Sequence, residues 1–138
     1  MFQLIIIGKL ILAGLLGAII GWERKFLAGR QAGIKTCTLV AMGSALFTLL
    51  SIDGFAGALT DPSRVAAQIV VGIGFLGAGT IMVYQGHIEG LTTAAGLWFI
   101  AAIGMAVAVD WYLVAVVTTI VVFTFLYVYN RLSIKKQS

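Results

Sequence analysis

Five long runs of apolar residues follow one another along the chain, and short polar segments separate them. The runs cover about residues 4–22, 34–52, 65–84, 91–109 and 111–129. A helix needs about 20 residues to cross the ~30 Å hydrocarbon core of a bilayer, and each run is close to that length. The runs do not alternate apolar and polar residues, which excludes barrel strands. The pattern predicts one all-α, polytopic membrane domain over residues 1–138 with five transmembrane helices.

Composition excludes the other broad classes of protein. Of the 138 residues, 61% are hydrophobic and 10% are charged, whereas a soluble domain has about 45–50% apolar and about 25% charged residues. A soluble globular domain could not bury this much apolar surface. The first run lacks a basic start and a small-residue cleavage site, so we expect it to be a helix and not a signal peptide. The lipid bilayer is therefore the first predicted partner.

The basic residues predict the orientation in the membrane. Seven of the nine positive residues lie between the first two runs, at the very start of the second run or after the fifth run, and five crossings place those segments on one side. Because cytoplasmic loops are enriched in Lys and Arg, we expect the N-terminus outside and the C-terminus in the cytoplasm. No basic stripe is interleaved with exposed aromatic residues, so nucleic-acid binding is not expected.

Glycine is concentrated in the first and third runs. The third run contains a G-x-G-x-x-G string from Gly72 to Gly77, followed by Gly79, and the first run contains Gly17 and Gly21. Nucleotide binding would require a strand before the string in a soluble βαβ unit, so no cofactor is expected. Close helix packing explains the glycines best, at Gly17, Gly21, Gly72, Gly74, Gly77 and Gly79. A broken helix or a narrow pore is the alternative.

The start of the third run combines a helix cap with polar residues on one face. Asp61 before Pro62 is typical of a helix start. Arg64, Gln68 and Gly72 follow at intervals of four residues and share one helix face. One interpretation is a capped helix with an interfacial arginine and one buried amide. The other is a surface that recognises an ion or a partner, because buried polar groups in membrane spans are costly.

A second group of polar candidates belongs to the cytoplasmic side. Glu23 and Arg24 end the first run, and the loop with His87 and Glu89 emerges on the same side. Glu23, His87 and Glu89 could together bind a divalent cation, although their spacing does not define such a site. Asp61 and Glu23 are the two carboxylates considered as metal ligands, and the sequence establishes no metal site.

The remaining polar residues do not indicate an enzyme. Thr92 and Thr93 open the fourth run, where they would cap the helix or line a polar path. Ser44 is the best serine nucleophile, but it lies in the second run, far from the loop that holds His87. Activation requires a base within about 3 Å. The chain is therefore not expected to be an enzyme.

Four strings in this sequence resemble the MgtC/SapB family of bacterial membrane proteins. They are the G-x-E-R-K string of the first helix, the A-G-x-K-T and L-V-A-x-G-S-A-L-F strings of the second, the D-x-x-R-V-A-A-Q-I-V string and glycine run of the third, and G-L-T-T-A-A-x-L-W of the fourth. In this chain they stand at residues 21–25, 32–36 with 39–47, 61–79 and 90–98.

The resemblance implies a multi-pass protein of the bacterial inner membrane with five spans. Family members are linked to survival in low magnesium, to acid stress and to growth inside host cells, and hence to virulence. The family resemblance also implies a regulatory partner, the proton-driven ATP synthase. Many members carry a soluble domain after the fifth span; nine residues follow Tyr129 here, so we expect the transmembrane domain alone.

Two functional hypotheses follow. The first is a non-enzymatic membrane protein that regulates magnesium balance or membrane energetics through helix contacts with partners. The second is an oligomeric channel or carrier for magnesium or another cation, with Glu23, Asp61, Arg64, Gln68 and the two threonines along its path. Five short helices are few for a monomeric carrier, and no inverted repeat is evident. The glycine faces favour a homo-oligomer, with a dimer as the simplest form.

Overall fold

The computed structural model describes residues 1–27, 32–55 and 61–135. Five α-helices account for most of this chain, and two of them continue into a π-helical turn. In chain order the elements are α1 (Phe2–Trp22), η1 (Glu23–Leu27), α2 (Ile34–Leu49), η2 (Leu50–Gly54), α3 (Ser63–Ala78), β1 (Met82–Tyr84), β2 (His87–Glu89), α4 (Leu91–Ala108) and α5 (Tyr112–Lys135).

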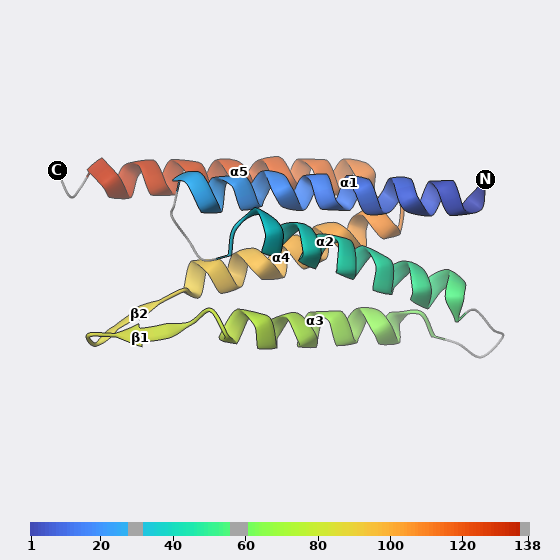
Figure 1. The fold of residues 1–138 in the computed structure, drawn as a ribbon, viewed down its shortest axis with the longest axis horizontal. Helices are drawn as coiled ribbons and strands as arrows, with labels where there is room; N and C mark the ends of the chain where they lie inside the picture. The colour runs from blue at the N-terminus through green and yellow to red at the C-terminus, as the bar shows by residue number, and fades with distance from the viewer. Residues whose placement is uncertain (28–31, 56–60, 136–138) are drawn as a thin grey trace.

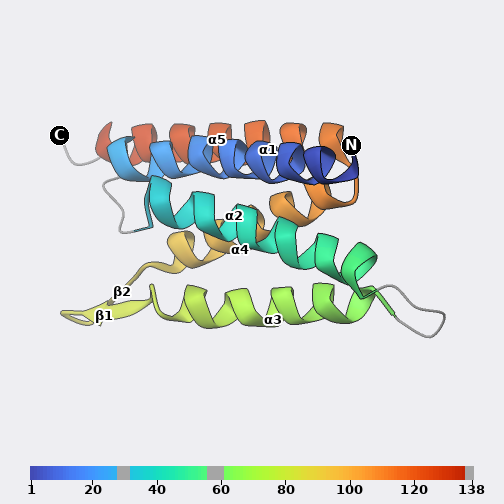
Figure 2. The ribbon, with the colours of Figure 1, turned by 45° about the vertical axis from the view of Figure 1, so that its right-hand side comes forward.

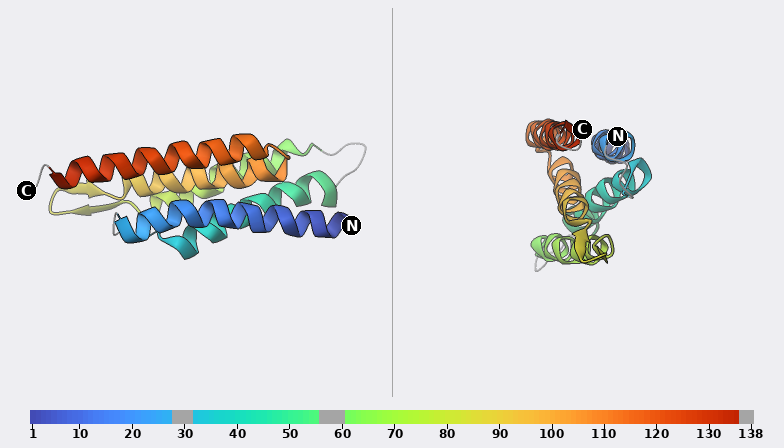
Figure 3. Two further views of the ribbon diagram at one scale, coloured as in Figure 1. Left: turned by 90° about the horizontal axis from the view of Figure 1, so that it is seen from above. Right: turned by 90° about the vertical axis from the view of Figure 1, so that its left-hand side faces the viewer.

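The five helices form one elongated bundle. Helices α1 and α5 lie side by side along one edge, α2 and α4 occupy the middle, and α3 lies along the opposite edge (Figures 1 and 2). The end-on view in Figure 3 shows the same order and separates α3 from α1 and α5. The two termini lie at opposite ends of the bundle (Figure 1). We call the end with η1, the hairpin and the C-terminus the basic end, and the other end the N-terminal end.

The helices have the length and apolarity that a bilayer requires. Four of them, including the π-helical extensions of α1 and α2, are long and apolar enough to cross a membrane, and α3 is a shorter apolar helix. The prediction of an all-α polytopic membrane protein with five helices is therefore confirmed. Most of the large apolar side chains on the outside of the bundle are exposed, as expected where lipid replaces water as the solvent.

Small residues close the centre of the bundle. A Cβ atom added to Gly17 of α1 would lie 2.6 Å from the carbonyl oxygen of Cys37 and 2.8 Å from Cβ of Ala41, both on α2. A Cβ on Gly104 of α4 would overlap the carbonyl group of Ala41. Helices α1 and α4 therefore approach the backbone of α2 from two sides, an approach that only residues without side chains permit.

The other predicted packing glycines behave differently from one another. A Cβ on Gly21 would lie 2.7 Å from Cα of Ile34, and one on Gly77 would lie 3.3 Å from Cβ of Ala94, so both face a neighbouring helix. Gly79 follows the last residue of α3 and has only its own preceding turn within 4 Å. Nothing in the described chain lies within 4 Å of a Cβ on Gly72 or Gly74, so these two glycines pack against no helix of the same chain.

The third predicted span was too long at its C-terminal end. Its helix ends at Ala78, and residues 82–89 form an antiparallel hairpin in which Met82 pairs with Glu89. Thr80 donates its hydroxyl proton to the carbonyl oxygen of Gly77 at 2.7 Å, which satisfies one of the last helical carbonyls. Gly86, at φ +79, lies in the tight turn that reverses the chain. The last three residues of the predicted span, Met82–Tyr84, form strand β1 and not a helix.

Candidate functional site

A buried polar cluster lies at the basic end of the bundle, where α1, α4 and α5 meet. Glu23 is 0% exposed and Arg24 is 2% exposed, and they are the two buried charged residues among the described part of the chain. Both belong to η1, the π-helical turn that continues α1. We refer to Glu23, Arg24 and Asn130 as the η1 cluster.

Glu23 reaches across the bundle to the last helix. The side-chain amide of Asn130 on α5 donates a hydrogen bond to Oε1 of Glu23 at 2.6 Å. The other oxygen, Oε2, is buried and has no hydrogen-bond partner among the described residues. A carboxylate oxygen buried in this way costs free energy unless another group satisfies it. The η1 cluster therefore retains an unused acceptor.

Arg24 joins the same turn to the first turn of α4. Its guanidinium donates a hydrogen bond to the carbonyl oxygen of Thr92. A Cβ on Gly96 would lie 2.7 Å from Nη2 of Arg24, so the glycine leaves the space that the guanidinium occupies. The sequence G-L-T-T-A-A-G thus places both a carbonyl acceptor and a gap one helical turn apart. Arg24 and Glu23 have opposite charges, so the two buried side chains of the turn together carry no net charge.

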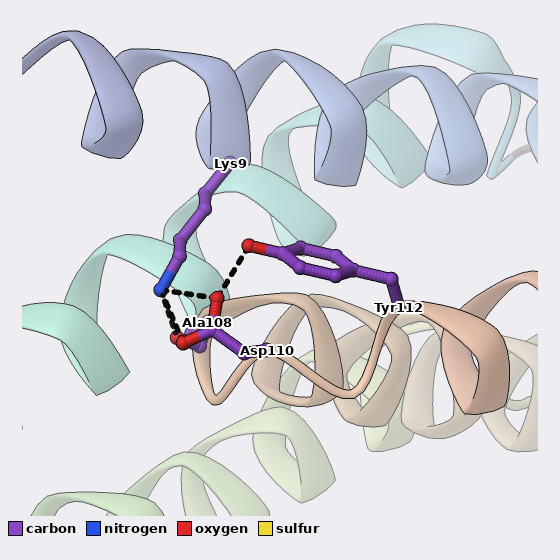
Figure 4. A network of polar contacts seen from close by, with 4 residues as sticks. All are labelled: Lys9, Ala108, Asp110 and Tyr112. Atoms are coloured by element: carbon purple, nitrogen blue, oxygen red, sulfur yellow. Dashed lines mark hydrogen bonds and ion pairs between the residues drawn. The ribbon is translucent and has the colours of Figure 1, made fainter.

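A second polar network lies at the N-terminal end and involves a different set of residues. Lys9 of α1 donates hydrogen bonds to the carbonyl oxygen of Ala108 at 2.9 Å and to Oδ2 of Asp110 at 3.0 Å. The hydroxyl of Tyr112 donates to Oδ1 of Asp110 (Figure 4). These hydrogen bonds hold the pKa of Asp110 below its ordinary value, and the bond from Tyr112 has a larger effect than the bond from Lys9. The network ties α1 to the turn between α4 and α5.

The structure separates the polar candidates at the start of α3 from the η1 cluster. Asp61 lies at the N-terminal end of the bundle. Its Oδ1 accepts two hydrogen bonds from Ser63, one from the backbone N–H at 2.9 Å and one from the side-chain hydroxyl at 2.7 Å. These two bonds to Ser63 lower the pKa of Asp61 below its ordinary value. Arg64 and Gln68 are exposed on α3. The helix begins at Ser63, directly after Pro62, and Asp61 accepts the first backbone N–H of the helix as a residue at a helix start is expected to do.

The two threonines at the start of α4, Thr92 and Thr93, differ in burial. Thr92 is exposed and contributes its carbonyl oxygen to Arg24, whereas Thr93 is buried. Deeper in the bundle, Thr48 and Thr119 bond to the carbonyl oxygens four residues earlier in their own helices, each at 2.8 Å. In the described residues these hydroxyls do not form a continuous polar path between the two ends.

The suggested cation site from Glu23, His87 and Glu89 is wrong. Glu23 is buried against α5, while His87 and Glu89 lie exposed on the hairpin. Within the ranges that the structure describes, no group of three or more His, Cys, Asp or Glu side chains could hold a metal ion. The residues fail to meet because η1 directs Glu23 into the bundle and the hairpin carries the other two away from it.

Sequence reasoning identified Glu23 and Arg24 but missed Asn130, which bonds to Glu23, and the Lys9–Asp110 pair at the other end of the bundle. Asn130 lies 107 residues from Glu23 along the chain, and its place near the end of the last apolar run resembled an ordinary interfacial residue. Lys9 and Asp110, which lie 101 residues apart along the chain, form an ion pair at 3.0 Å. One signal for that pair was available, since both residues lie at the same predicted membrane surface.

Comparison with known proteins identifies the family. The model of the MgtC family matches residues 10–134, which is most of the chain. The chain belongs to the MgtC family. It is 43% identical over 133 residues to the protein named "Putative magnesium transporter YhiD" of Escherichia coli K12, a match that covers 92% of this chain and 61% of the relative. No solved structure matches the chain.

Two MgtC proteins are further relatives. "Protein MgtC" of Brucella abortus strain 2308 is 52% identical over 93 residues, which covers 67% of this chain and 38% of that protein. "Protein MgtC" of Salmonella typhimurium is 46% identical over 114 residues, covering 83% and 48%. This chain therefore spans about three-fifths or less of the length of these relatives.

Proposed function

We propose that this protein is a non-enzymatic regulator of magnesium homeostasis in the bacterial inner membrane, and that it acts through contacts with other membrane proteins without conducting the ion. The observation that carries the proposal is the closed centre of the bundle. Lys9 and Glu23 begin the two polar networks and lie fourteen residues apart on one continuous helical segment, which corresponds to about 21 Å. Between them, α1 buries Ala13, Leu16, Gly17 and Ile20.

The packing of α2 supports the same proposal. Gly17 and Gly104 bring two helices against the backbone around Ala41, a buried residue in the middle of α2. A hydrated cation crossing the bilayer needs a succession of oxygen ligands or water along its path. Most buried side chains of the described bundle are apolar, and Thr48 and Thr119 donate their hydroxyl protons to carbonyl oxygens of their own helices. The few other buried hydroxyls are scattered, so they support no continuous path of oxygen ligands through a single copy.

The η1 cluster is the part of the bundle that we assign to regulation. It is buried, it joins three helices, and its unused carboxylate oxygen lies at the end of the bundle that the basic residues assign to the cytoplasm. The family resemblance makes the ATP synthase the first partner to test. A cation carrier remains the alternative, and the relative named "Putative magnesium transporter YhiD" favours it.

A growth experiment tests the assignment of the η1 cluster. A strain that lacks its own copy and grows poorly in low magnesium is complemented with the wild-type gene, with Glu23→Gln and with Glu89→Gln. We expect Glu23→Gln to lose complementation although the protein reaches the membrane, because the amide changes the charge of a buried cluster. Glu89 is exposed on the hairpin, so Glu89→Gln should complement like the wild type.

Two results would contradict this assignment. Full complementation by Glu23→Gln at wild-type protein levels would show that regulation does not depend on the charge of the cluster. Equal loss of complementation by Glu89→Gln would place the functional surface on the hairpin. Immunoblots of membrane fractions provide the measure of protein level for all three strains.

A further inference from the structure

One face of α3 carries polar and charged residues and is turned away from the rest of the bundle. Arg64, Gln68, Gly72 and Phe75 recur at intervals of three or four residues and form one stripe along α3, and Asp61 lies just before the helix, three residues before Arg64. We call this set the α3 stripe. Phe75 is 83% exposed, and nothing lies within 4 Å of a Cβ on Gly72. The buried residues of α3, Ile73 and Gly77, lie on the opposite side.

Gln68 is the residue of the stripe whose side-chain hydrogen bonds lipid cannot provide. It lies five residues inside α3, it is exposed, and its amide makes no hydrogen bond to any residue that the structure describes. Acyl chains offer neither a donor nor an acceptor, so an amide facing them loses its hydrogen bonds. The amide therefore needs a polar partner from outside this chain.

The stripe borders an open groove between α2 and α3. The groove has a volume of about 550 Å³, and its wall includes Gln68 and Gly72 of α3 and Gly43, Ser44 and Phe47 of α2. Like Gly72, Gly43 has nothing within 4 Å of an added Cβ. The groove thus combines apolar walls, two glycines that permit close backbone approach, and one amide at membrane depth, which are the features of a helix–helix interface in a bilayer.

We propose that the α3 stripe is the interface of a homodimer, and that the α3 helix of a second copy occupies the groove beside it. Two copies inserted in the same orientation are related by a twofold axis along the membrane normal, so each residue lies at the same depth as its counterpart. Gln68 then faces the partner's Gln68. A primary amide contains both a donor and an acceptor, so two of them satisfy each other.

The charges at the start of α3 fit the same arrangement. Asp61 and Arg64 are three residues apart on the stripe, and both are exposed at the N-terminal end. Asp61 uses Oδ1 for both of its bonds to Ser63, and Oδ2 makes no hydrogen bond in the described chain. Across a twofold axis, Arg64 of each copy faces Asp61 of the other copy, so the dimer contains two equivalent contacts between opposite charges. Gly72, one turn beyond Gln68, lets the two backbones approach.

Two glycines of α3 provide a matched test. Gly72→Leu and Gly74→Leu make the same chemical change in the same helix, and neither new side chain meets an atom of the same chain within 4 Å of its Cβ. Only Gly72 belongs to the α3 stripe. In lipid vesicles, single-molecule photobleaching of labelled protein at decreasing density should show a wild-type dimer. Gly72→Leu should weaken dimerisation by about tenfold or more, while Gly74→Leu should leave it within about threefold.

Crosslinking provides a second measurement that does not depend on disrupting the protein. In a Cys37→Ala background, which removes the single native cysteine, Gln68→Cys should form a disulfide-linked dimer on mild oxidation. Val117→Cys is the control, because Val117 is exposed at a comparable distance from the start of α5. Efficient crosslinking at residue 68 and little at residue 117 would support the proposal.

Three results would overturn the proposed interface. A protein that stays monomeric at every density would show that lipid fills the groove. A dimer that is equally sensitive to Gly72→Leu and Gly74→Leu, or insensitive to both, would place the interface elsewhere. Equal crosslinking at residues 68 and 117 would indicate random collision. None of these results depends on magnesium, so they leave the proposed regulatory function to its own tests.

Discussion

Gly104→Ala is expected to destabilise the bundle strongly, although alanine is the better helix former. The new Cβ would overlap the carbonyl group of Ala41, lying 3.0 Å from its carbon and closer still to its oxygen. Backbone atoms in the middle of a packed helix cannot rotate away as a side chain would, so α2 and α4 must separate. We expect a loss of about 3 kcal/mol, near the upper end of the cost of overpacking, measured as thermal unfolding in detergent.

Gly8→Ala is the matched control for that prediction. Gly8 also lies in a helix, α1, but nothing lies within 4 Å of an added Cβ there. Its replacement should be neutral or stabilise the protein by up to about 1 kcal/mol, the difference in helix propensity. If both alanine variants unfold at the same temperature as the wild type, the close contact between α2 and α4 does not exist in the protein.

The second large effect is expected at the η1 cluster. Arg24→Leu removes a buried positive charge and its hydrogen bond to Thr92 and leaves Glu23 buried without the neighbouring charge. Breaking a buried ion pair by removing one partner costs about 3–5 kcal/mol. We expect a smaller loss here, about 2–3 kcal/mol, because Glu23 keeps its hydrogen bond to Asn130. The double variant Glu23→Gln with Arg24→Leu should recover much of that loss, since no uncompensated charge remains. Thermal unfolding of the two single variants and the double variant in detergent measures the coupling.

Lys25→Leu separates this effect from a general loss of positive charge. Lys25 follows Arg24 in the sequence but is exposed, with its Nζ 4.9 Å from the centre of the Phe26 ring. Its replacement should change stability by no more than about 0.5 kcal/mol. Additive effects of the changes at residues 23 and 24 would show that the two charges do not compensate each other inside the bundle.

The sequence predicted the helices well because lipid imposes a simple rule on length and apolarity. The predicted run 91–109 differs from α4 (Leu91–Ala108) by one residue. The same rule failed after Ala78, where hydropathy could not distinguish an apolar strand from the end of a helix. The Gln85-Gly86 turn was the available signal, since both residues adopt positive φ in the hairpin.

The sequence predicted only part of the η1 cluster, and the reason differs from that for the helices. Glu23 and Arg24 are adjacent in sequence, so their charges could be noticed together, and their burial follows from how η1 continues α1. Asn130 meets Glu23 only through the packing of α5 beside α1, and no local pattern encodes that contact. Glycine composition predicted close packing, but only the structure shows that Gly17 faces α2 whereas Gly72 faces no helix of this chain.

Magnesium uptake into liposomes tests most directly the central claim that the protein regulates without conducting the ion. Purified wild-type protein is reconstituted at a density that permits dimers, and a magnesium-sensitive dye inside the vesicles reports entry. We predict uptake no faster than in protein-free vesicles, with correct folding verified by thermal unfolding of the same preparation. Saturable uptake that disappears in Asp61→Asn or Glu23→Gln would contradict the account and make the protein a carrier.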